Sequence, residues 1–336
     1  MLYKKAGLTA FLSYEYRNFA LTDTTNIPGQ RIINNYKESS LSIGGELSKK
    51  QGKLLHYNIL RELAIAGEDA GQFSVEGRGD LNLRLFGDTV RLDVNAFIKN
   101  QNPVFYFRHF QSKHYWWDNN DLSKIMRTRL EGKLSLNRWG TQLRAGVENI
   151  KNYTYLANAS IPVKDSEGNV TGFKNNAAVR QYSGNIQIFT AMLQQKLKVG
   201  IFHLDGEVAY QKSSEQDILP LPELSAYGNL YMKFGLAKKV LQIEMGADVR
   251  YFSKYYAPDY SPVIGQFYNQ NPDDKIEIGA FPIVNVYANL HLKRTRFFIM
   301  MYHVNAGSGK SNYFLAPHYP INPRMIKFGL SWNFFD

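Results

Sequence analysis

The chain has 336 residues, a formal net charge of +11 and a mean hydropathy of −0.36, and 14% of its residues are aromatic. No apolar run approaches the length of about 18 residues that a membrane-spanning helix needs, and this excludes a helical membrane protein. The lack of cysteine excludes disulfide frameworks and thiolate metal sites, and dispersed Lys and Arg without a basic run argue against nucleic-acid binding.

Alternation of apolar and polar residues recurs about fourteen times along the chain and predicts an all-β, antiparallel fold. In residues 240–251, for example, Leu241 and Ile243 share one face while Gln242 and Glu244 share the other. The predicted strands lie near residues 9–21, 38–48, 54–65, 73–85, 90–99, 124–137, 141–154, 180–197, 200–212, 226–237, 240–251, 281–293, 296–304 and 325–335.

Short turns and longer connections alternate strictly between these strands. The short turns lie around residues 51–52, 87–88, 139–140, 199–200, 238–239 and 294–295. The longer connections hold most of the prolines and lie near residues 22–37, 66–72, 101–123, 155–179, 213–225, 254–280 and 305–324. Short turns at one end of a sheet and long loops at the other are the layout of bacterial outer-membrane barrels, with the short turns in the periplasm and the long loops outside the cell.

The polar faces of the strands favour a transmembrane barrel over a soluble sandwich or propeller. Several predicted strands reach the nine to eleven residues, roughly, that a tilted membrane strand needs, and burying their charges without water would cost several kcal/mol for each unpaired ion. A water-filled lumen removes this cost. The candidate pore-lining residues are Glu76, Arg78, Asp80, Arg84, Arg91, Asp93, Arg127, Arg129, Glu131, Lys133, Arg144, Glu148, Glu244, Asp248 and Arg250.

Aromatic residues gather near the predicted strand ends. Trp and Tyr are favoured at the headgroup level of a membrane because their rings are amphipathic. The candidate membrane-interface aromatics are Trp116, Trp117, Trp139, Tyr251, Trp332, Phe334 and Phe335. Stacking against sugars is the alternative role for the aromatic clusters near residues 106–117 and 251–256, and the sequence does not separate the two.

The C-terminal sequence resembles the closing strand of outer-membrane barrels, with Ile326, Phe328, Leu330, Trp332 and Phe334 on one face. Together with the preceding segment 317–324 and the segment 219–224, this end is similar to the "Putative porin" family of Bacteroidota. The resemblance implies an outer-membrane location, a pore function and no catalytic residues. Family members carry a signal sequence and more strands, and the N-terminal segment Met1–Leu8 has no signal-like apolar region. We therefore interpret residues 1–336 as a single barrel domain, the C-terminal part of a longer one.

Two motifs suggest other chemistry and fail their context tests. Residues 306–311 contain Gly-Lys-Ser, but a phosphate-binding loop also needs a glycine where Val304 stands and a helix afterwards. The seven histidines show no paired spacing suited to zinc, and no Ser, His and acidic constellation stands out. The sequence predicts neither an enzyme, nor a metal site, nor a cofactor.

The sequence therefore predicts an outer-membrane porin for passive diffusion of small hydrophilic solutes, with a mild preference for anions because Lys and Arg are in excess. The expected partners are outer-membrane lipid, the barrel-assembly machinery through the C-terminal strand, and the solutes themselves; assembly into a homo-oligomer stays open. The alternatives are the barrel portion of a TonB-dependent nutrient receptor, with a plug domain, and a non-conducting surface or adhesion barrel that binds through its loops.

Overall fold

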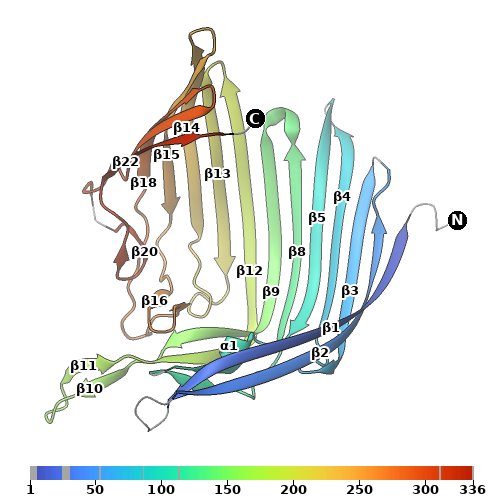
Figure 1. Ribbon diagram of the computed structural model, residues 1–336, viewed down its shortest axis with the longest axis vertical. Coiled ribbons are helices and arrows are strands. Elements are labelled where there is room, and N and C mark those ends of the chain that lie inside the picture. The colour runs from blue at the N-terminus through green and yellow to red at the C-terminus, as the bar shows by residue number, and fades with distance from the viewer. Residues whose placement is uncertain are drawn as a thin grey trace.

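The computed structural model describes residues 6–24, 31–52, 54–85, 87–112, 114–309 and 312–334. Its main feature is an antiparallel sheet of fourteen strands, which confirms the all-β prediction and the expected number of strands (Figure 1). In the sheet each strand neighbours the next in chain order. The strands are β1 Gly7–Thr24, β2 Arg31–Lys49, β3 Leu55–Gly67, β4 Phe73–Leu85, β5 Asp88–Gln101, β8 Ile125–Leu136, β9 Thr141–Asn158, β12 Ala177–Val199, β13 Phe202–Ser213, β14 Leu224–Leu236, β15 Leu241–Phe252, β18 Ile283–Leu292, β19 Thr295–Tyr302 and β22 Met325–Trp332.

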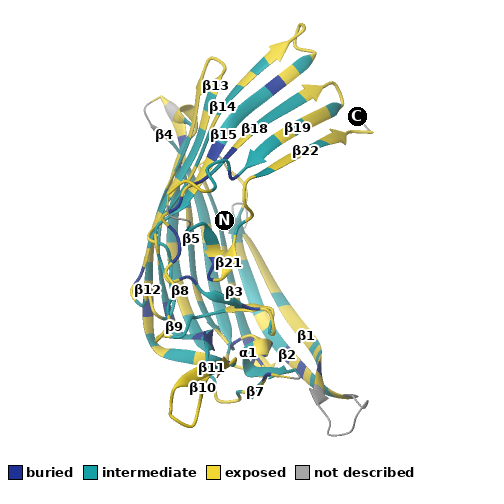
Figure 2. Ribbon diagram, turned by 90° about the vertical axis from the view of Figure 1, so that its left-hand side faces the viewer, coloured by how far each residue is buried: buried dark blue, intermediate teal, exposed yellow. Residues whose placement is uncertain are grey.

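The sheet is strongly curved but open. Strand β1 pairs only with β2, and β22 pairs only with β19, so within the described residues the expected barrel is not closed. Figure 2 shows the C-terminal strands β18, β19 and β22 leaning away from the long N-terminal strands. The strand predicted over 325–335 ends at Trp332, because its neighbour β19 begins at Thr295, the residue that pairs with Trp332.

The connections follow the predicted alternation, although β1 and β2 occupy residues 22–24 and 31–37 of the connection predicted near residues 22–37. At one end of the sheet the strands join through a few residues, including the 3-10 turn η2 Asn137–Trp139, which is followed by Gly140 at φ +62°. A Cβ at Gly140 would lie 2.3 Å from the Lys196 carbonyl oxygen, so this turn requires glycine. At the other end lie the long connections, which fold into one short helix and four hairpins: α1 Phe105–Arg108, β6 His109–Gln111 with β7 Trp116–Asp118, β10 Ile161–Lys164 with β11 Val170–Lys174, β16 Asp259–Ser261 with β17 Gln266–Tyr268, and β20 Phe314–Ala316 with β21 Tyr319–Pro320.

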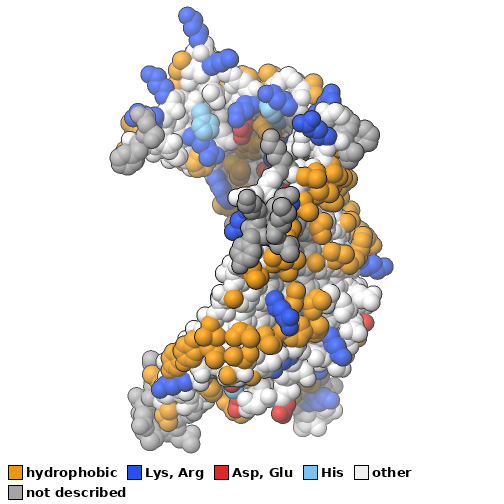
Figure 3. Space-filling view, turned by 90° about the vertical axis from the view of Figure 1, so that its right-hand side faces the viewer, with side chains coloured by type: hydrophobic (Ala, Val, Ile, Leu, Met, Phe, Trp, Pro, Cys, Tyr) orange, Lys and Arg blue, Asp and Glu red, His pale blue; other side chains and the backbone are white. Residues whose placement is uncertain are grey.

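One face of the sheet is apolar although it is exposed. Cross-strand partners point to the same face, and Leu12, Ile43 and Leu130 belong to a face whose large hydrophobic side chains remain accessible, up to 83% for Leu8. Figure 3 shows hydrophobic side chains gathered in a broad patch on the side of the molecule that carries the first strands. Such a face suits lipid contact. Among the described residues, no helix is long and apolar enough to cross a bilayer.

The best-buried side chains lie in the loop layer more than in the sheet. Ile278, His303 and Pro317, all in long connections, are nearly inaccessible. His303 has ring contacts with Phe281 and Tyr313 at centroid distances of 5.7 and 4.9 Å. The long loops therefore have a small core of their own, which holds them in defined positions above the end of the sheet.

Candidate functional site: the polar face and its inward segment

The register places all fifteen candidate pore-lining residues on one face of the sheet. One row across the N-terminal half joins Asp80, Asp93, Lys133 and Arg144 as successive cross-strand partners on β4, β5, β8 and β9. The candidates of the C-terminal half follow the same rule, since Asp248 on β15 is the partner of Asn285 on β18. We call this surface the polar face.

Short ion pairs cover the N-terminal half of the polar face. Lys99 lies 2.6 Å from Glu76, Lys133 lies 3.1 Å from Asp93, and the Arg127 Nε donates to Glu148 at 2.7 Å. Further pairs join Arg78 to Glu76, Arg91 to Asp80 and Asp93, Arg129 to Glu131 and Glu148, and Arg144 to Glu131.

The cations and anions of these pairs differ in exposure. The carboxylates lie close to the sheet, with Glu148 only 10% and Asp93 only 15% exposed, whereas the side chain of Arg127 is 44% and that of Arg91 50% exposed. The guanidinium groups therefore project furthest from the wall. Because each pair remains in contact with water, it contributes at most about 1 kcal/mol to stability. The polar face of β4–β9 behaves as a solvated wall with a cationic outer layer.

The C-terminal half of the polar face is built differently. Glu244 contacts Lys233 at 3.5 Å, while Asp248 accepts a hydrogen bond from Asn285 at 2.9 Å. The guanidinium of Arg250 lies over the Tyr227 ring at 5.8 Å. Tyrosines Tyr227, Tyr231 and Tyr287 share this face with the charges. They are absent from the predicted pore-lining residues, although their position in the period-2 alternation identifies them.

The connection between β5 and β8, which the structure describes over residues 102–112 and 114–124, folds over the polar face, and we call it the inward segment. The ring of Phe105 in α1 stacks on Phe19 of β1, with centroids 3.8 Å apart and planes at 6°, and meets Tyr36 of β2 edge-on at 5.4 Å. Phe19 and Tyr36 are cross-strand partners on the same face as Arg17 and Glu38. The inward segment is thereby fixed to the first two strands.

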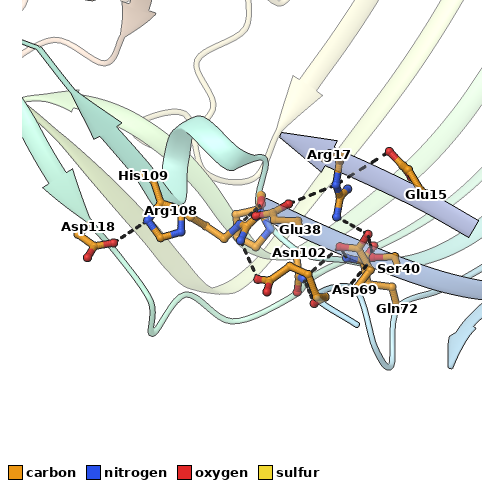
Figure 4. A network of polar contacts seen from close by, with 12 residues as sticks. Glu15, Arg17, Glu38, Ser40, Asp69, Gln72, Asn102, Arg108, His109 and Asp118 are labelled. Carbon is orange, nitrogen blue, oxygen red and sulfur yellow. Dashed lines mark hydrogen bonds and ion pairs between the residues drawn. The ribbon is translucent and has the colours of Figure 1, made fainter. Parts of the chain in front are cut away.

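An ion network anchors the same contact (Figure 4). Arg108 of α1 donates to Glu38 at 2.7 Å and to Glu68 at 2.8 Å. Arg17 lies 3.2 Å from Glu38 and 2.6 Å from Asp69. Since Glu38 is only 7% exposed and lies between two arginines, each charge in the network depends on its partners.

The inward segment also reaches across the sheet to β9. Its residues Tyr106, Phe107 and Trp117 line a cavity of about 340 Å³ together with Leu156 of β9 and Ile264 of the β16–β17 hairpin. Strands β3, β4, β5 and β8 separate β2 from β9 in the sheet, so the segment spans much of the concave surface near its loop end. This position narrows the space over the polar face.

The candidate interface aromatics lie in three places. Trp116 and Trp117 belong to the inward segment, where Trp117 stacks on Phe110 at 4.5 Å. Trp139 lies at the end with the short turns, and Trp332 stacks on Phe334 at 6.0 Å. Tyr251 lies on β15 at the loop end, and Phe335 lies outside the described residues.

Metal and phosphate chemistry find little support in the part of the chain that the structure describes. It contains no group of three or more His, Asp or Glu side chains arranged to hold an ion. His56, His109 and His318 each pair with a single carboxylate. Residues 306–309 form a turn and bend after β19, and Lys310 and Ser311 of the Gly-Lys-Ser motif lie outside the described residues.

A fourteen-stranded antiparallel sheet with an apolar outer face, a charged inner face, short turns at one end and loops at the other defines the class of outer-membrane β-barrel proteins. The family described as "Putative porin" matches residues 2–336, and the chain belongs to this family. Membership implies a location in the bacterial outer membrane. No curated protein sequence matches the chain significantly.

Solved structures with the same fold are receptor and transporter barrels. The copper transporter OprC superposes with a TM-score of 0.65 at 12% identity over 98% of this chain and 56% of its own. The siderophore receptor PirA from Acinetobacter baumannii gives a TM-score of 0.64 at 10% identity over 97% of this chain and 52% of its own. The FrpB iron transporter from Neisseria meningitidis gives 0.59 at 12% identity, over 97% and 52%. The chain thus spans about half the length of these proteins.

Proposed function

We propose that this protein forms a water-filled pore through which small hydrophilic solutes diffuse passively. The observation that carries the proposal is the register of the sheet, which puts fifteen charged side chains on one face and large apolar side chains on the other. A wall of solvated ion pairs offers no tight binding site and leaves solutes free to pass. The proposal requires both sheet edges to be paired in the membrane, because unpaired backbone groups cannot face lipid.

The pore we propose has a narrow zone and a charge preference. The inward segment lies over the polar face near the loop end and reduces the open cross-section there. The guanidinium groups of β4–β9 project further than the carboxylates that pair with them, so passing solutes meet cations first. The projecting cations support mild anion selectivity. Lipid contact on the apolar face and assembly by the barrel-assembly machinery through β22 belong to the same proposal.

Single-channel conductance tests the proposal. The full-length protein, purified from outer membranes, is reconstituted in a planar bilayer under a salt gradient. Stable open channels are expected, with a reversal potential whose sign indicates that anions permeate better than cations. A folded, heat-modifiable barrel that leaves the bilayer silent would overturn the pore, and a reversal potential on the cation side would overturn the selectivity.

The likeness to receptor barrels favours a second candidate, a gated nutrient receptor. The fold matches the siderophore receptor PirA, the FrpB iron transporter and the copper transporter OprC, with TM-scores of 0.59 to 0.65. A receptor needs a plug inside the barrel, and it would conduct only when the plug moves. The bilayer experiment separates the two, because the pore conducts without an energy-coupling partner and the receptor stays closed.

A further inference from the structure

A second polar site lies outside the polar face, in the loop layer. Four long connections together line a cavity of about 460 Å³, which we call the loop pocket. Tyr115 comes from the inward segment, Phe173 from the β10–β11 hairpin, Tyr260 from the β16–β17 hairpin, and His318 and Tyr319 from the last loop. The volume lies within the range of roughly 300–1,000 Å³ that is usual for small-molecule sites.

Aromatic side chains supply the apolar part of the loop pocket. Tyr260 and Tyr319 meet edge to face at a centroid distance of 5.6 Å. Tyr319 is 43% exposed and Phe173 is 56% exposed, so both rings present free surface. Burial raises the pKa of the Tyr268 phenol, and its hydroxyl group accepts a hydrogen bond from the Asn158 side-chain amide at 3.4 Å.

The polar lining is made of amides and carboxylates. Asn158, Asn175 and Asn271 contribute amides, while Asp259 and Asp274 contribute carboxylates. Asp259 lies 3.2 Å from the His318 Nδ1. Among the described residues that line this pocket there is no Lys or Arg. The lining therefore offers many hydrogen-bond donors and acceptors but no cationic clamp for a phosphate or carboxylate ligand.

The loop pocket is held in place by hydrogen bonds that its walls make with the rest of the loop layer. The backbone of Asn269 makes two hydrogen bonds of 2.8 Å with the C-terminal end of β9: its N–H donates to the Leu156 carbonyl oxygen, and its carbonyl oxygen accepts from the Asn158 N–H. The side-chain amide of Asn269 donates to the Asp217 and Ile218 carbonyl oxygens at 3.2 and 2.8 Å. These bonds join connections that are distant in sequence, so the site exists before a ligand arrives.

We propose that the loop pocket binds an uncharged saccharide of one to three sugar units. A pyranose ring has an apolar C–H face that stacks on an aromatic ring, and its hydroxyl groups pair with amides and carboxylates. Neutral saccharides need both kinds of surface and no counter-charge. Anionic ligands, including ferric catecholates, meet carboxylates in the lining, and repulsion between like charges disfavours them. The proposal goes beyond the pore, because binding at equilibrium does not depend on conduction.

Isothermal titration calorimetry on the full-length protein in detergent micelles tests this. The probes are neutral maltotriose, xylotriose, mannotriose and N-acetylchitotriose, with oligogalacturonate as an anionic and chitosan trimer as a cationic comparison. At least one neutral probe is expected to bind with a Kd in the millimolar range, roughly, or tighter. Absence of binding by every neutral probe, or binding by a charged probe alone, would overturn the proposal.

Matched variants place the binding in the loop pocket. Tyr260→Ala and Tyr319→Ala are expected to weaken saccharide binding about tenfold, because each removes a stacking surface. Tyr260→Phe keeps the ring and is expected to keep most of the affinity. Tyr256→Ala is the control, since Tyr256 is an exposed tyrosine of the same connection outside the pocket. Equal loss in Tyr256→Ala and Tyr260→Ala, or no loss in Tyr260→Ala, would refute the assignment.

The saccharide can be a free oligosaccharide or an uncharged stretch of the glycan of lipopolysaccharide, and the two sources share this chemistry. The probe that binds in micelles is titrated into nanodiscs with and without purified lipopolysaccharide. The same titrations are carried out with Tyr260→Phe and Tyr256→Ala, two variants that keep the loop pocket. If lipopolysaccharide weakens binding of the probe in the wild type but not in these variants, the result contradicts a common site for the two sugars. Equal weakening in all three proteins assigns lipopolysaccharide as the source, and unchanged binding assigns the free sugar.

Discussion

The polar face and the loop pocket are both rich in polar side chains, yet these side chains differ in type and in how they are held. On the polar face the charges lie in pairs along the strands. The cations project further into water than the carboxylates, which lie close to the sheet. In the loop pocket the polar groups are amides and carboxylates, and Asn269, which lies between two lining residues in the chain, bonds their connection to the backbone of another loop. The first surface is solvated and adjustable, and the second is preorganised.

This difference indicates what each surface can do. Solvated ion pairs are disturbed at a small free-energy cost and can rearrange around a passing solute. They therefore make permeation depend on the charge of the solute without binding it. Preorganised hydrogen-bond groups lower the entropy cost of binding and favour one ligand geometry. The inward segment lies beside both, because it rests on the polar face through Phe105 and lines the loop pocket through Tyr115.

Releasing the inward segment is expected to have the largest effect. Glu38→Ala leaves Arg17 and Arg108 without their shared carboxylate, and loss of one partner from a largely buried network costs about 3 kcal/mol. Hydrogen exchange over residues 105–118 is then expected to quicken about 100-fold, and single-channel conductance to rise. Glu15→Ala is the control, since Glu15 is 60% exposed and 3.9 Å from Arg17. Unchanged exchange in Glu38→Ala would show that the aromatic contacts suffice.

Removing the support of the loop pocket is expected to weaken binding without affecting the pore. Asn269→Ala deletes two hydrogen bonds to the connection 214–223, each worth about 1 kcal/mol. The saccharide Kd is expected to rise about fivefold, while conductance and reversal potential stay as in the wild type. A conductance change as large as the loss of affinity would mean that the two surfaces are not independent.

Changing the outer layer of the polar face is expected to shift ion preference. The double variant Arg127→Gln and Arg129→Gln removes two projecting cations, and the chloride-to-potassium permeability ratio is expected to fall about twofold. Glu148→Gln, which removes their shared anion, is expected to move the ratio in the opposite direction. Reversal potentials in a salt gradient give both values. Shifts of the same sign in the two variants would contradict a charge-selective wall.

The smallest expected effect concerns pH at the β10–β11 hairpin. Hydrogen bonds from the backbone of Asn169, then of Glu167, hold the pKa of the exposed Asp165 carboxyl below its usual value. The carboxylate therefore stabilises the turn above the carboxyl's ordinary pKa, and this support is lost as the pH falls through the lowered pKa. The hydrogen-exchange protection factor over 161–174, which is corrected for the intrinsic pH dependence of exchange, is expected to fall in acid in the wild type. In Asp165→Asn it is expected to depend less on pH.

The strands and their faces could be predicted because the signal is local. Alternation of Leu241 with Gln242 along one strand already separates two faces, and short turns force neighbouring strands to pair in chain order. The charged candidates consequently fell on one face. The tyrosines Tyr227 and Tyr231 were missed on the polar face because aromatic residues were assigned to membrane interfaces by type and not by their position in the alternation.

The inward segment and the loop pocket could not be predicted in the same way. Helix α1 has only four residues and no periodic pattern, and it is held by contacts such as Arg108 with Glu38, 70 residues apart. The loop pocket joins Asn158 and Tyr268, 110 residues apart, and its walls come from four connections. A short stretch of sequence carries no pattern that predicts contacts between residues so far apart in the chain.

The sequence by itself determined the all-β class, the fourteen strands, their order and the division into an apolar and a charged face. These properties depend on neighbours along the chain and across one turn, where side-chain alternation and turn residues act directly. The tertiary structure alone decided that residues 102–124 lie over the polar face, that the guanidinium groups stand above the carboxylates, and that four loops enclose a pocket. Each of these depends on contacts between distant segments, whose energies are decided only when the curved sheet brings the segments together.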